Sequence, residues 1–271
     1  MRVIVTRPAA ECESWSGLLR QAGFDAVALP LIAIHPLAEP GRAALLQAWA
    51  GLGSWRAVMF VSAAAVQHFF DAAPEGSAWP AGTRAWAPGP GTAAVLLARG
   101  VAAADIDQPP PDAPRLDSEA LWQAAGHRIA PGDGALIVRG AEQGQDDPAR
   151  AGHGRAWMAE RLCSAGALVS TIAAYSRAAP AWTATQAAEA ARLASPDSAW
   201  VFSNSEAVTH LFALLPQAAA ALRLGGAIAT HPRIAAAARA AGFARVIAAS
   251  PGRDGLIEAL HTLERSIESA G

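Results

Sequence analysis

The chain has 271 residues, long enough for two domains with separate cores, because single hydrophobic cores stop growing at roughly 250 to 300 residues. Hydrophobic residues make up 52% and charged residues 16% of the sequence, which excludes a disordered chain. The net charge of −2 lacks the basic surplus of a general nucleic-acid-binding protein.

Neither a membrane span nor a secretion signal is expected. No apolar run reaches the length of about 18 residues that a spanning helix needs, and the opening MRVIVTRPAAEC lacks the regions of a signal peptide. A cytoplasmic location is the resulting expectation. Cys12 and Cys163 have no CxxC partner, so we expect buried small hydrophobic residues rather than a disulfide or a zinc site.

Predicted strands and helices alternate along the whole chain. Residues 1–34 are predicted to form a strand, an Arg-bearing turn, a helix and a second strand, and residues 135–175 repeat this order. Residues 55–125 are predicted to form two strands, each followed by a polar turn and a helix, and residues 199–262 repeat that order. Such alternation is typical of parallel sheets covered by helices on both faces. Segments 108–117 and 141–154 are expected to be surface loops.

Two of these segments match at a constant offset of 142 residues, which indicates a duplicated unit. The final helix of each copy is expected to end at a glycine. The recurring histidines are expected to lie on a helix surface or to be half-buried. The matched pairs are Phe60 with Phe202, Ala65 with Ala207, Val66 with Val208, His68 with His210, Phe70 with Phe212, Ala85 with Ala227, Ala87 with Ala229, Pro90 with Pro232, Ala93 with Ala235, Ala94 with Ala236, and Gly100 with Gly242.

The periodicity leaves two ways to combine the four segments. Neighbouring segments could form the two domains, or 55–125 could join 135–175 while 1–34 joins 199–262. The runs LIAIHPLAEP and VSTIAAYSRAAP both end at proline, an arrangement that would suit a two-stranded bridge between domains.

Ligand sites in such sheets form at the carboxyl ends of the strands, where turns meet helix N-termini. Backbone N–H groups and helix dipoles attract anions there, although a single Ser or Thr at such a turn is more often an ordinary helix cap. Two such edges facing each other would form an anion-binding cleft. The turns are TRP at 6–8, VSAA at 61–64, PGPGT at 88–92, VRG at 138–140, SNSE at 203–206 and THPR at 230–233.

Other site patterns are weak or missing from the sequence. GPGTAA at 89–94 fits the dinucleotide pattern GxGxxA, but Pro90 lacks an N–H and we find no acidic residue at the usual place after the next strand. The sequence contains no HxxH or HExxH motif or carboxylate cluster for a metal, and no GxSxG motif of a hydrolase.

A series of motifs spread along the chain resembles the uroporphyrinogen-III synthase family. Each motif is loose, whereas the ordered set is specific and spans nearly the whole chain. The matching pieces are VIVTRP, LLRQAGFDAVALPLIAIHPL, AVMFVSAAAV, DSEAL, LIVRG, GRAWMAERLCSAGA, AAYSR, WVFSNSEAV and RIAAAARAAGF.

The resemblance implies two similar doubly wound α/β domains with parallel sheets, joined by a two-stranded antiparallel linker and with the active-site cleft between them. The terminal domain would comprise 1–34 and 176–271, the central domain 38–170, and the linker strands 35–37 and 171–175. Family members are cytoplasmic monomers that use no cofactor and no metal. The implied partner is a small-molecule substrate, handed over transiently by the preceding bilane-forming enzyme, with no nucleic acid and no membrane.

The implied reaction is the cyclisation of hydroxymethylbilane with loss of water, in which ring D is inverted through a spiro intermediate. Tyr175, the only tyrosine, matches a family tyrosine and is implied to be catalytic by assisting departure of the hydroxyl group. The alternative for Tyr175 is an amphipathic residue at a domain hinge. The residues implied to hold the substrate's carboxylates are Arg7, Ser62, Ala63, Thr92, Arg139, Ser203, Asn204, Ser205 and Arg233.

Three departures from the family pattern keep a second function open. An insertion separates Gly140 from Gly154, which puts a binding role of Arg155 in doubt, and Val61 stands where a threonine is common. At 234 an isoleucine replaces an expected hydroxyl residue, with Arg233 as the candidate substitute. The alternative function is a non-catalytic two-domain module that binds a tetrapyrrole or another ligand.

Overall fold

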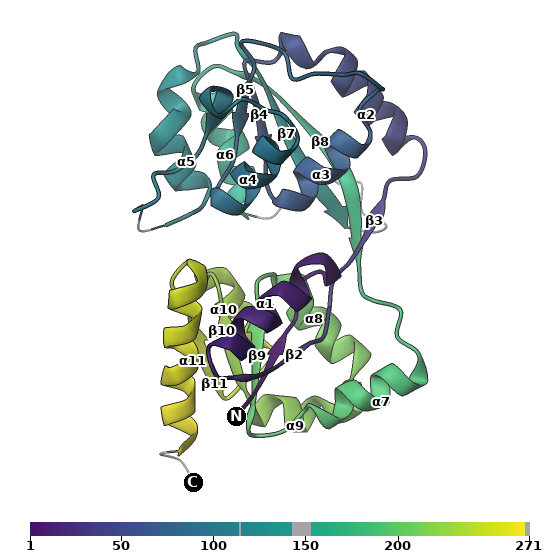
Figure 1. Ribbon diagram of the computed structural model, residues 1–271, viewed down its shortest axis with the longest axis vertical. Helices are drawn as coiled ribbons and strands as arrows, with labels where there is room; N and C mark the ends of the chain where they lie inside the picture. The colour runs from purple at the N-terminus through teal and green to yellow at the C-terminus, as the bar shows by residue number, and fades with distance from the viewer. Residues whose placement is uncertain (114, 143–152, 269–271) are drawn as a thin grey trace. The chain divides into compact units, whose positions relative to one another are not determined.

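The structure of the chain is a computed structural model that describes residues 1–113, 115–142 and 153–268 (Figure 1). The chain divides into two compact units. Unit 1 comprises Met1–Ile34 and Ala178–Gly271, and unit 2 comprises His35–Arg177. Each unit contains a parallel sheet with helices on both faces, so the predicted α/β class is confirmed.

Unit 1 contains a five-stranded sheet in the order β11-β10-β9-β1-β2, with every neighbouring pair parallel. The central strand β9 is buried at every position, as expected for a parallel strand covered on both faces. The elements are β1 (Arg2–Val5), α1 (Ala9–Gln21), β2 (Asp25–Ala28), α7 (Ala184–Arg192), β9 (Ser198–Phe202), α8 (Ser205–Leu214), η5 (Pro216–Ala218), α9 (Ala219–Leu224), β10 (Gly226–Ala229), α10 (Pro232–Ala240), β11 (Arg245–Ala248) and α11 (Gly252–Glu268).

Unit 2 contains a six-stranded sheet in the order β3-β8-β7-β4-β5-β6, in which β8 to β6 run parallel. Strand β8 pairs with β7 from Leu168 to Arg177, so residues 171–175 lie within this sheet. The elements are β3 (Ala33–Pro36), α2 (Gly41–Ala50), η1 (Leu52–Ser54), β4 (Ala57–Phe60), α3 (Ala63–Asp71), β5 (Arg84–Trp86), α4 (Pro90–Ala98), η2 (Ala103–Asp105), β6 (Ile106–Asp107), α5 (Ser118–Ala125), η3 (Gly126–Arg128), β7 (Gly134–Glu142), α6 (His153–Ser164) and β8 (Leu168–Ala178).

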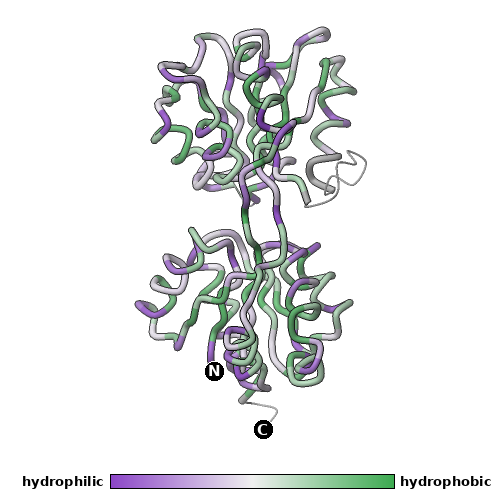
Figure 2. The backbone as a smooth tube through the Cα atoms, turned by 90° about the vertical axis from the view of Figure 1, so that its right-hand side faces the viewer, coloured by the Kyte–Doolittle hydropathy of each residue, from purple (hydrophilic) through white to green (hydrophobic). Residues whose placement is uncertain are grey.

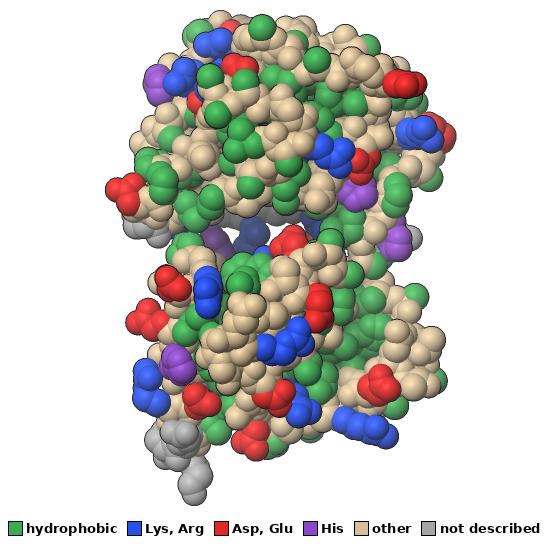
Figure 3. Space-filling model, in the orientation of Figure 1, with side chains coloured by type: hydrophobic (Ala, Val, Ile, Leu, Met, Phe, Trp, Pro, Cys, Tyr) green, Lys and Arg blue, Asp and Glu red, His purple; other side chains and the backbone are tan. Residues whose placement is uncertain are grey.

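Hydrophobic and charged residues separate as the sequence pattern predicts. Figure 2 shows hydrophobic residues along the strands inside unit 1. On the face drawn in Figure 3, the described Arg side chains lie interspersed with Asp and Glu and do not gather into one patch.

Within the described ranges, no single helix is long and apolar enough to cross a membrane. The bent pair Ser205–Leu214 and Pro216–Leu224 passes the test of length and composition only when the two helices are taken together.

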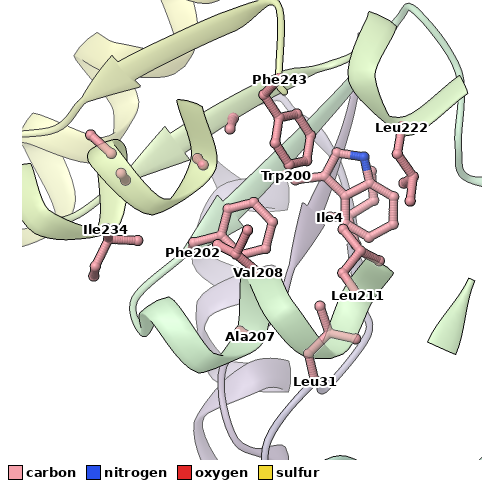
Figure 4. Close-up of a cluster of buried hydrophobic side chains, with 14 of the residues drawn as sticks. Ile4, Leu31, Trp200, Phe202, Ala207, Val208, Leu211, Leu222, Ile234 and Phe243 are labelled. Atoms are coloured by element: carbon pink, nitrogen blue, oxygen red, sulfur yellow. The ribbon is translucent and has the colours of Figure 1, made fainter. Parts of the chain in front are cut away.

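Alternation along the strands of unit 1 supplies both faces of its sheet. Val3 and Val5 pack with residues of α1 and α11 on one face. Ile4, Trp200 and Phe202 pack with α8 and α10 on the other face (Figure 4). Because successive side chains of a strand point to opposite faces, these short strands fill two hydrophobic cores.

The sheet of unit 2 is covered in the same way. Met59 and Ile137 pack with α5 and α6 on one face. On the other face an aromatic cluster joins strand and helices: the Phe60 and Phe69 rings are 5.4 Å apart, and Trp49 of α2 stacks on Phe69 at 4.9 Å. The indole N–H of Trp49 donates a hydrogen bond to the Phe69 carbonyl at 2.7 Å.

Strand pairing settles how the four sequence segments combine. β1 pairs with β9, and β7 pairs with β4, so 1–34 joins 199–262 and 55–125 joins 135–175. The two sheets then have matching orders, in which β10, β9, β1 and β2 of unit 1 correspond to β5, β4, β7 and β8 of unit 2. The glycines expected after the repeated helices, Gly100 and Gly242, both have a positive φ.

Candidate functional site

Tyr175 is buried in unit 2 and contacts three other elements there. Its side chain is 3% exposed, and its hydroxyl lies 3.2 Å from Ser62 Oγ. The ring lies against Gly140, where an added Cβ would be 2.5 Å from the ring atoms Cε2 and Cζ. The His68 ring packs beside it, with centroids 5.4 Å apart. Tyr175 is therefore held in a seat made by the carboxyl ends of β4 and β7 and by helix α3.

Ser62 caps helix α3, as its position after a strand predicts. Its hydroxyl accepts a hydrogen bond from the Ala65 N–H at 3.2 Å and lies beside the hydroxyl of Tyr175. Ala63 is the first residue of the helix, so it contributes its backbone N–H to the open helix start. Two hydroxyl groups and a helix N-terminus are thus brought together at this edge.

His68 is half-buried on α3, as predicted, and burial lowers the pKa of its imidazole below the usual value. The neutral imidazole is therefore favoured near neutral pH. The repeat partner of His68, His210, is also half-buried, and its Nδ1 lies 2.7 Å from the Leu31 carbonyl oxygen.

Two other predicted residues of unit 2 follow the same strand edge. Arg139 lies in β7 immediately before a register shift in the β7–β8 pairing, and its Nη1 donates to the Gly140 carbonyl oxygen at 3.5 Å. Thr92 lies in the first turn of α4, but its side chain is only 7% exposed. The cap of that helix is Gly89, so Thr92 is not the cap residue.

In unit 1 the predicted residues SNS at 203–205 lie where β9 meets α8. We expected Ser203 and Ser205 to act as caps, but the cap is Asn204, whose side chain accepts a hydrogen bond from the Glu206 N–H at 2.8 Å. Asn204 is the repeat partner of Ser62. Both serines are half-buried beside this helix start.

The two predicted arginines of unit 1 differ in their surroundings. Arg7 forms an ion pair with Glu11 at 2.9 Å, and its guanidinium lies 4.3 Å from the centre of the Trp15 ring. A substrate carboxylate at Arg7 would therefore compete with Glu11. Arg233 is exposed in the first turn of α10, which is capped by His231.

The two copies of the repeat carry different chemistry at matching positions. Thr92 of unit 2 corresponds to Ile234 of unit 1, which packs in the hydrophobic core and is 5% exposed. Counted from the equivalent glycines Gly23 and Gly166, Tyr175 corresponds to the buried Ile32. At these two positions, hydroxyl groups are present in unit 2 only.

The dinucleotide-like turn corrects one of our expectations. Strand β5 does lead into α4 through GPGTAA, and an acidic residue, Asp107, does stand in the following strand β6. The expectation that this position lacks an acidic residue was wrong. Asp107 accepts two hydrogen bonds from Arg84, at 2.6 and 2.9 Å, and one from the Trp86 indole N–H at 3.0 Å. Because its oxygens are engaged within unit 2, Asp107 gives little support to a nucleotide site.

Cysteine and metal chemistry add little to the site. Cys12 is buried as expected, and burial raises the pKa of its thiol to about 11, so it stays protonated near neutral pH. Cys163 is exposed, so the prediction that it is buried was wrong.

Across the described ranges, no group of three His, Cys, Asp or Glu residues is placed to hold a metal ion. The side chain of Arg155 and the insertion residues 143–152 lie outside the described residues.

The fold and these turns define a class of protein: a duplicated parallel α/β chain with helix N-termini and polar side chains at the carboxyl edge of each sheet. Residues 13–258 match the family model described as Uroporphyrinogen-III synthase HemD. The chain belongs to this uroporphyrinogen-III synthase family, which supports a place in tetrapyrrole biosynthesis.

Solved structures share the fold at low sequence identity. A mutant uroporphyrinogen III synthase from Thermus thermophilus is 18% identical, with a TM-score of 0.56 and 99% of each chain covered. The uroporphyrinogen-III synthetase of Helicobacter pylori is 13% identical, with a TM-score of 0.54, and covers 97% of this chain and 100% of its own. No curated protein matched the chain.

Proposed function

We propose that the protein is a uroporphyrinogen-III synthase, a cyclising lyase that converts hydroxymethylbilane to uroporphyrinogen III and water. The family match over residues 13–258 is the observation that carries this proposal. The proposed enzyme acts as a cytoplasmic monomer, requires no cofactor, and receives its substrate from the bilane-forming enzyme.

The proposed chemistry begins with loss of the terminal hydroxyl group. Its carbon–oxygen bond breaks, the oxygen takes up a proton and leaves as water, and the pyrrole nitrogen stabilises the resulting azafulvenium cation. The substituted carbon of ring D attacks this cation and forms a spiro intermediate. The bond between ring D and its original methylene bridge then breaks and leaves a second azafulvenium cation at that bridge. The other α-carbon of ring D attacks this cation to close the macrocycle, and that carbon then loses its proton. Because the pyrroles supply the electrons, the protein has mainly to orient the chain and to provide one proton donor.

Tyr175 is the proposed proton donor or hydrogen-bond donor to the leaving hydroxyl. Its oxygen lies beside Ser62 Oγ at the start of α3, where a second hydroxyl can support the phenol. The burial of Tyr175 supports a defined orientation, since a phenol in a packed seat loses little freedom when substrate binds. Departure of an alcohol oxygen as water requires such a donor.

The turns at the two sheet edges are the proposed binding sites for the substrate's carboxylates. The starts of α3 and α8 present backbone N–H groups, capped by Ser62 and Asn204, and a helix N-terminus favours negative charge. Ala63, Thr92, Arg139, Ser203, Ser205, Arg7 and Arg233 are the other proposed binding residues. The Arg7 side chain is already paired with Glu11, and the Thr92 hydroxyl is buried. At these two turns we therefore expect backbone N–H groups, and not the side chains, to bind the carboxylates.

An assay with freshly formed hydroxymethylbilane tests the proposal. The bilane-forming enzyme generates the substrate in the cuvette, and the product is oxidised and resolved into its isomers. We expect the type III isomer. Because the free bilane closes without inverting ring D, a reaction that yields only the type I isomer at every protein concentration would refute the proposed activity.

The Tyr175→Phe substitution tests the proposed role of the phenol. It removes one oxygen and keeps the ring, so we expect kcat to fall by about tenfold, which corresponds to about 1.4 kcal/mol of transition-state stabilisation, with a smaller change in KM. Thermal unfolding of the variant serves as the control for folding. An unchanged kcat would remove Tyr175 from the mechanism.

A second candidate function is a non-catalytic module that binds a tetrapyrrole. The burial of Ile234 in the core of unit 1 favours it, because the hydroxyl expected at this turn is replaced by a packed hydrocarbon side chain. Tight binding of the bilane, measured by calorimetry with an inert analogue, together with no isomer III formation, would select this alternative.

A further inference from the structure

Gly140 leaves the space in which the ring of Tyr175 lies. A Cβ atom at position 140 would be 2.5 Å from Cε2 and Cζ of Tyr175 and 2.9 Å from its hydroxyl oxygen. Distances below 3.0 Å are not tolerated without movement, and the ring is confined on its other sides. The present position of Tyr175 therefore requires glycine at 140.

A bulge between β7 and β8 brings these two residues together. The register pairs Arg139 with Ala173 and then Gly140 with Tyr175, so β8 has one extra residue at this point. Such an extra residue re-aims the side chains that follow it. The bulge thus turns the Tyr175 ring onto the bare backbone of Gly140.

The remaining contacts fix the hydroxyl end of the ring. Ser62 Oγ lies 3.2 Å from the phenol oxygen and already accepts the Ala65 N–H. The Ser62 proton can therefore be donated to the phenol oxygen, which leaves the phenol proton available to a ligand. His68 packs on the ring with a tilt of 31°.

We propose that Gly140 is a positioning residue for Tyr175: its missing side chain lets the ring settle where its hydroxyl meets Ser62, with His68 as a further wall. This inference rests on the proposed function, because it assigns Tyr175 to the proton-donating step. Gly140 acts only through the tyrosine and touches no substrate.

The Gly140→Ala substitution tests this role. We expect kcat to fall by about tenfold, to the level of Tyr175→Phe, with KM changed much less. The double variant Gly140→Ala with Tyr175→Phe should be no slower than Tyr175→Phe, because the added methyl group acts through the hydroxyl that is already missing.

Gly134→Ala provides a matched control. Gly134 lies in the same strand, and its added Cβ would also meet an aromatic ring, at 3.0 Å from Cε3 of Trp55. This variant should keep the wild-type kcat. Loss of activity in both variants to the same degree would show that crowding in β7 is harmful in general and would overturn the proposal.

A second readout follows from Tyr175 being the only tyrosine. Protein labelled with ¹³C at tyrosine Cζ should give one tyrosine resonance, which we expect to shift in Gly140→Ala and to stay in place in Gly134→Ala. In Gly140→Ala, a shifted resonance with unchanged kcat would overturn the positioning role. An unshifted resonance in this variant would show that the Tyr175 ring does not pack against residue 140.

If Gly140→Ala does not fold, His68→Ala replaces it, because it removes another side chain that packs against the ring of Tyr175. We then expect a shifted tyrosine resonance together with a lowered kcat. If neither the resonance nor kcat changed, the proposal would be overturned. Failure of the proposed function has a different signature: wild-type protein would form no isomer III, while the resonance would still report on the seat.

Discussion

Trp86 and Trp200 show how two equally buried side chains can differ in what they contribute. Both are fully buried. The Trp86 indole N–H donates to Asp107 Oδ2 at 3.0 Å, whereas Trp200 Nε1 is buried without a hydrogen-bond partner among the described residues. A buried donor without a partner loses its hydration and gains nothing in return.

We therefore expect Trp86→Phe to destabilise the protein by about 1 to 3 kcal/mol more than Trp200→Phe, because only the first removes a hydrogen bond to a charged group. Both substitutions remove a similar volume, so each is the control for the other. Urea unfolding of the two variants gives the free energies. Equal losses would show that packing volume, and not the hydrogen bond, determines the cost.

At the scale of elements, ion pairs join strand ends in both sheets, in different surroundings. Arg84 of β5 binds Asp107 of β6 with 14% and 9% of their side chains exposed, and this hydrogen bonding raises the pKa of the Arg84 guanidinium. Arg2 of β1 binds Asp25 of β2 at 2.8 Å with more than half of each side chain exposed. Strand β6 has only two residues and lies at the sheet edge, so few backbone hydrogen bonds hold it to β5. The Arg84–Asp107 ion pair adds a side-chain link between these two strands.

The Asp107→Asn substitution should destabilise the protein by about 3 kcal/mol, because it removes the nearer counter-charge of Arg84, at 2.6 Å, and leaves only the more distant Asp105 carboxylate, at 3.6 Å. The Asp25→Asn substitution should cost less than about 1 kcal/mol, because water screens the exposed pair. Chemical unfolding at low and at high salt checks both values. A larger cost for Asp25→Asn would contradict the assignment of the stabilising pair to β6.

At the scale of the whole molecule, the two units have the same strand order but a different chain order. In unit 2 the chain runs through β4, β5 and β6 before it reaches β7 and β8. In unit 1 the equivalents of β7 and β8, namely β1 and β2, come first, and the rest follow after residue 177. Unit 1 therefore needs both segments, because β1 lies between β9 and β2 in its sheet.

A rearranged chain tests this relation. We expect residues 178–268 followed by a short linker and residues 1–34 to fold cooperatively, because this chain has the element order of unit 2. Residues 178–268 alone should not fold, since β9 loses its neighbour β1 and the core around Val3 and Val5 is removed. Circular dichroism during heating distinguishes the two outcomes. Cooperative unfolding of the shorter fragment would contradict the requirement for β1.

Local patterns were enough to predict much of this protein. The offset between Phe60 and Phe202 revealed the repeat, and the glycines Gly100 and Gly242 marked helix ends, because short-range backbone preferences act alike in both copies. The helix start at Ser62 was predicted for the same reason. For helix α8 the sequence predicted a serine cap, whereas the structure has Asn204 as the cap. Ser203, Asn204 and Ser205 can all cap a helix, so the sequence alone does not choose among them.

Contacts between residues distant in sequence required the fold. Strand pairing chose between the two ways of joining the four segments, because hydrogen bonds between strands leave no mark in either strand's own pattern. Asp107 was not predicted as the acidic residue of this turn, because a strand of only two residues has no recognisable periodicity. The seat of Tyr175 on Gly140 arises from one extra residue in β8, and a register shift of that kind is defined only when both strands are in place.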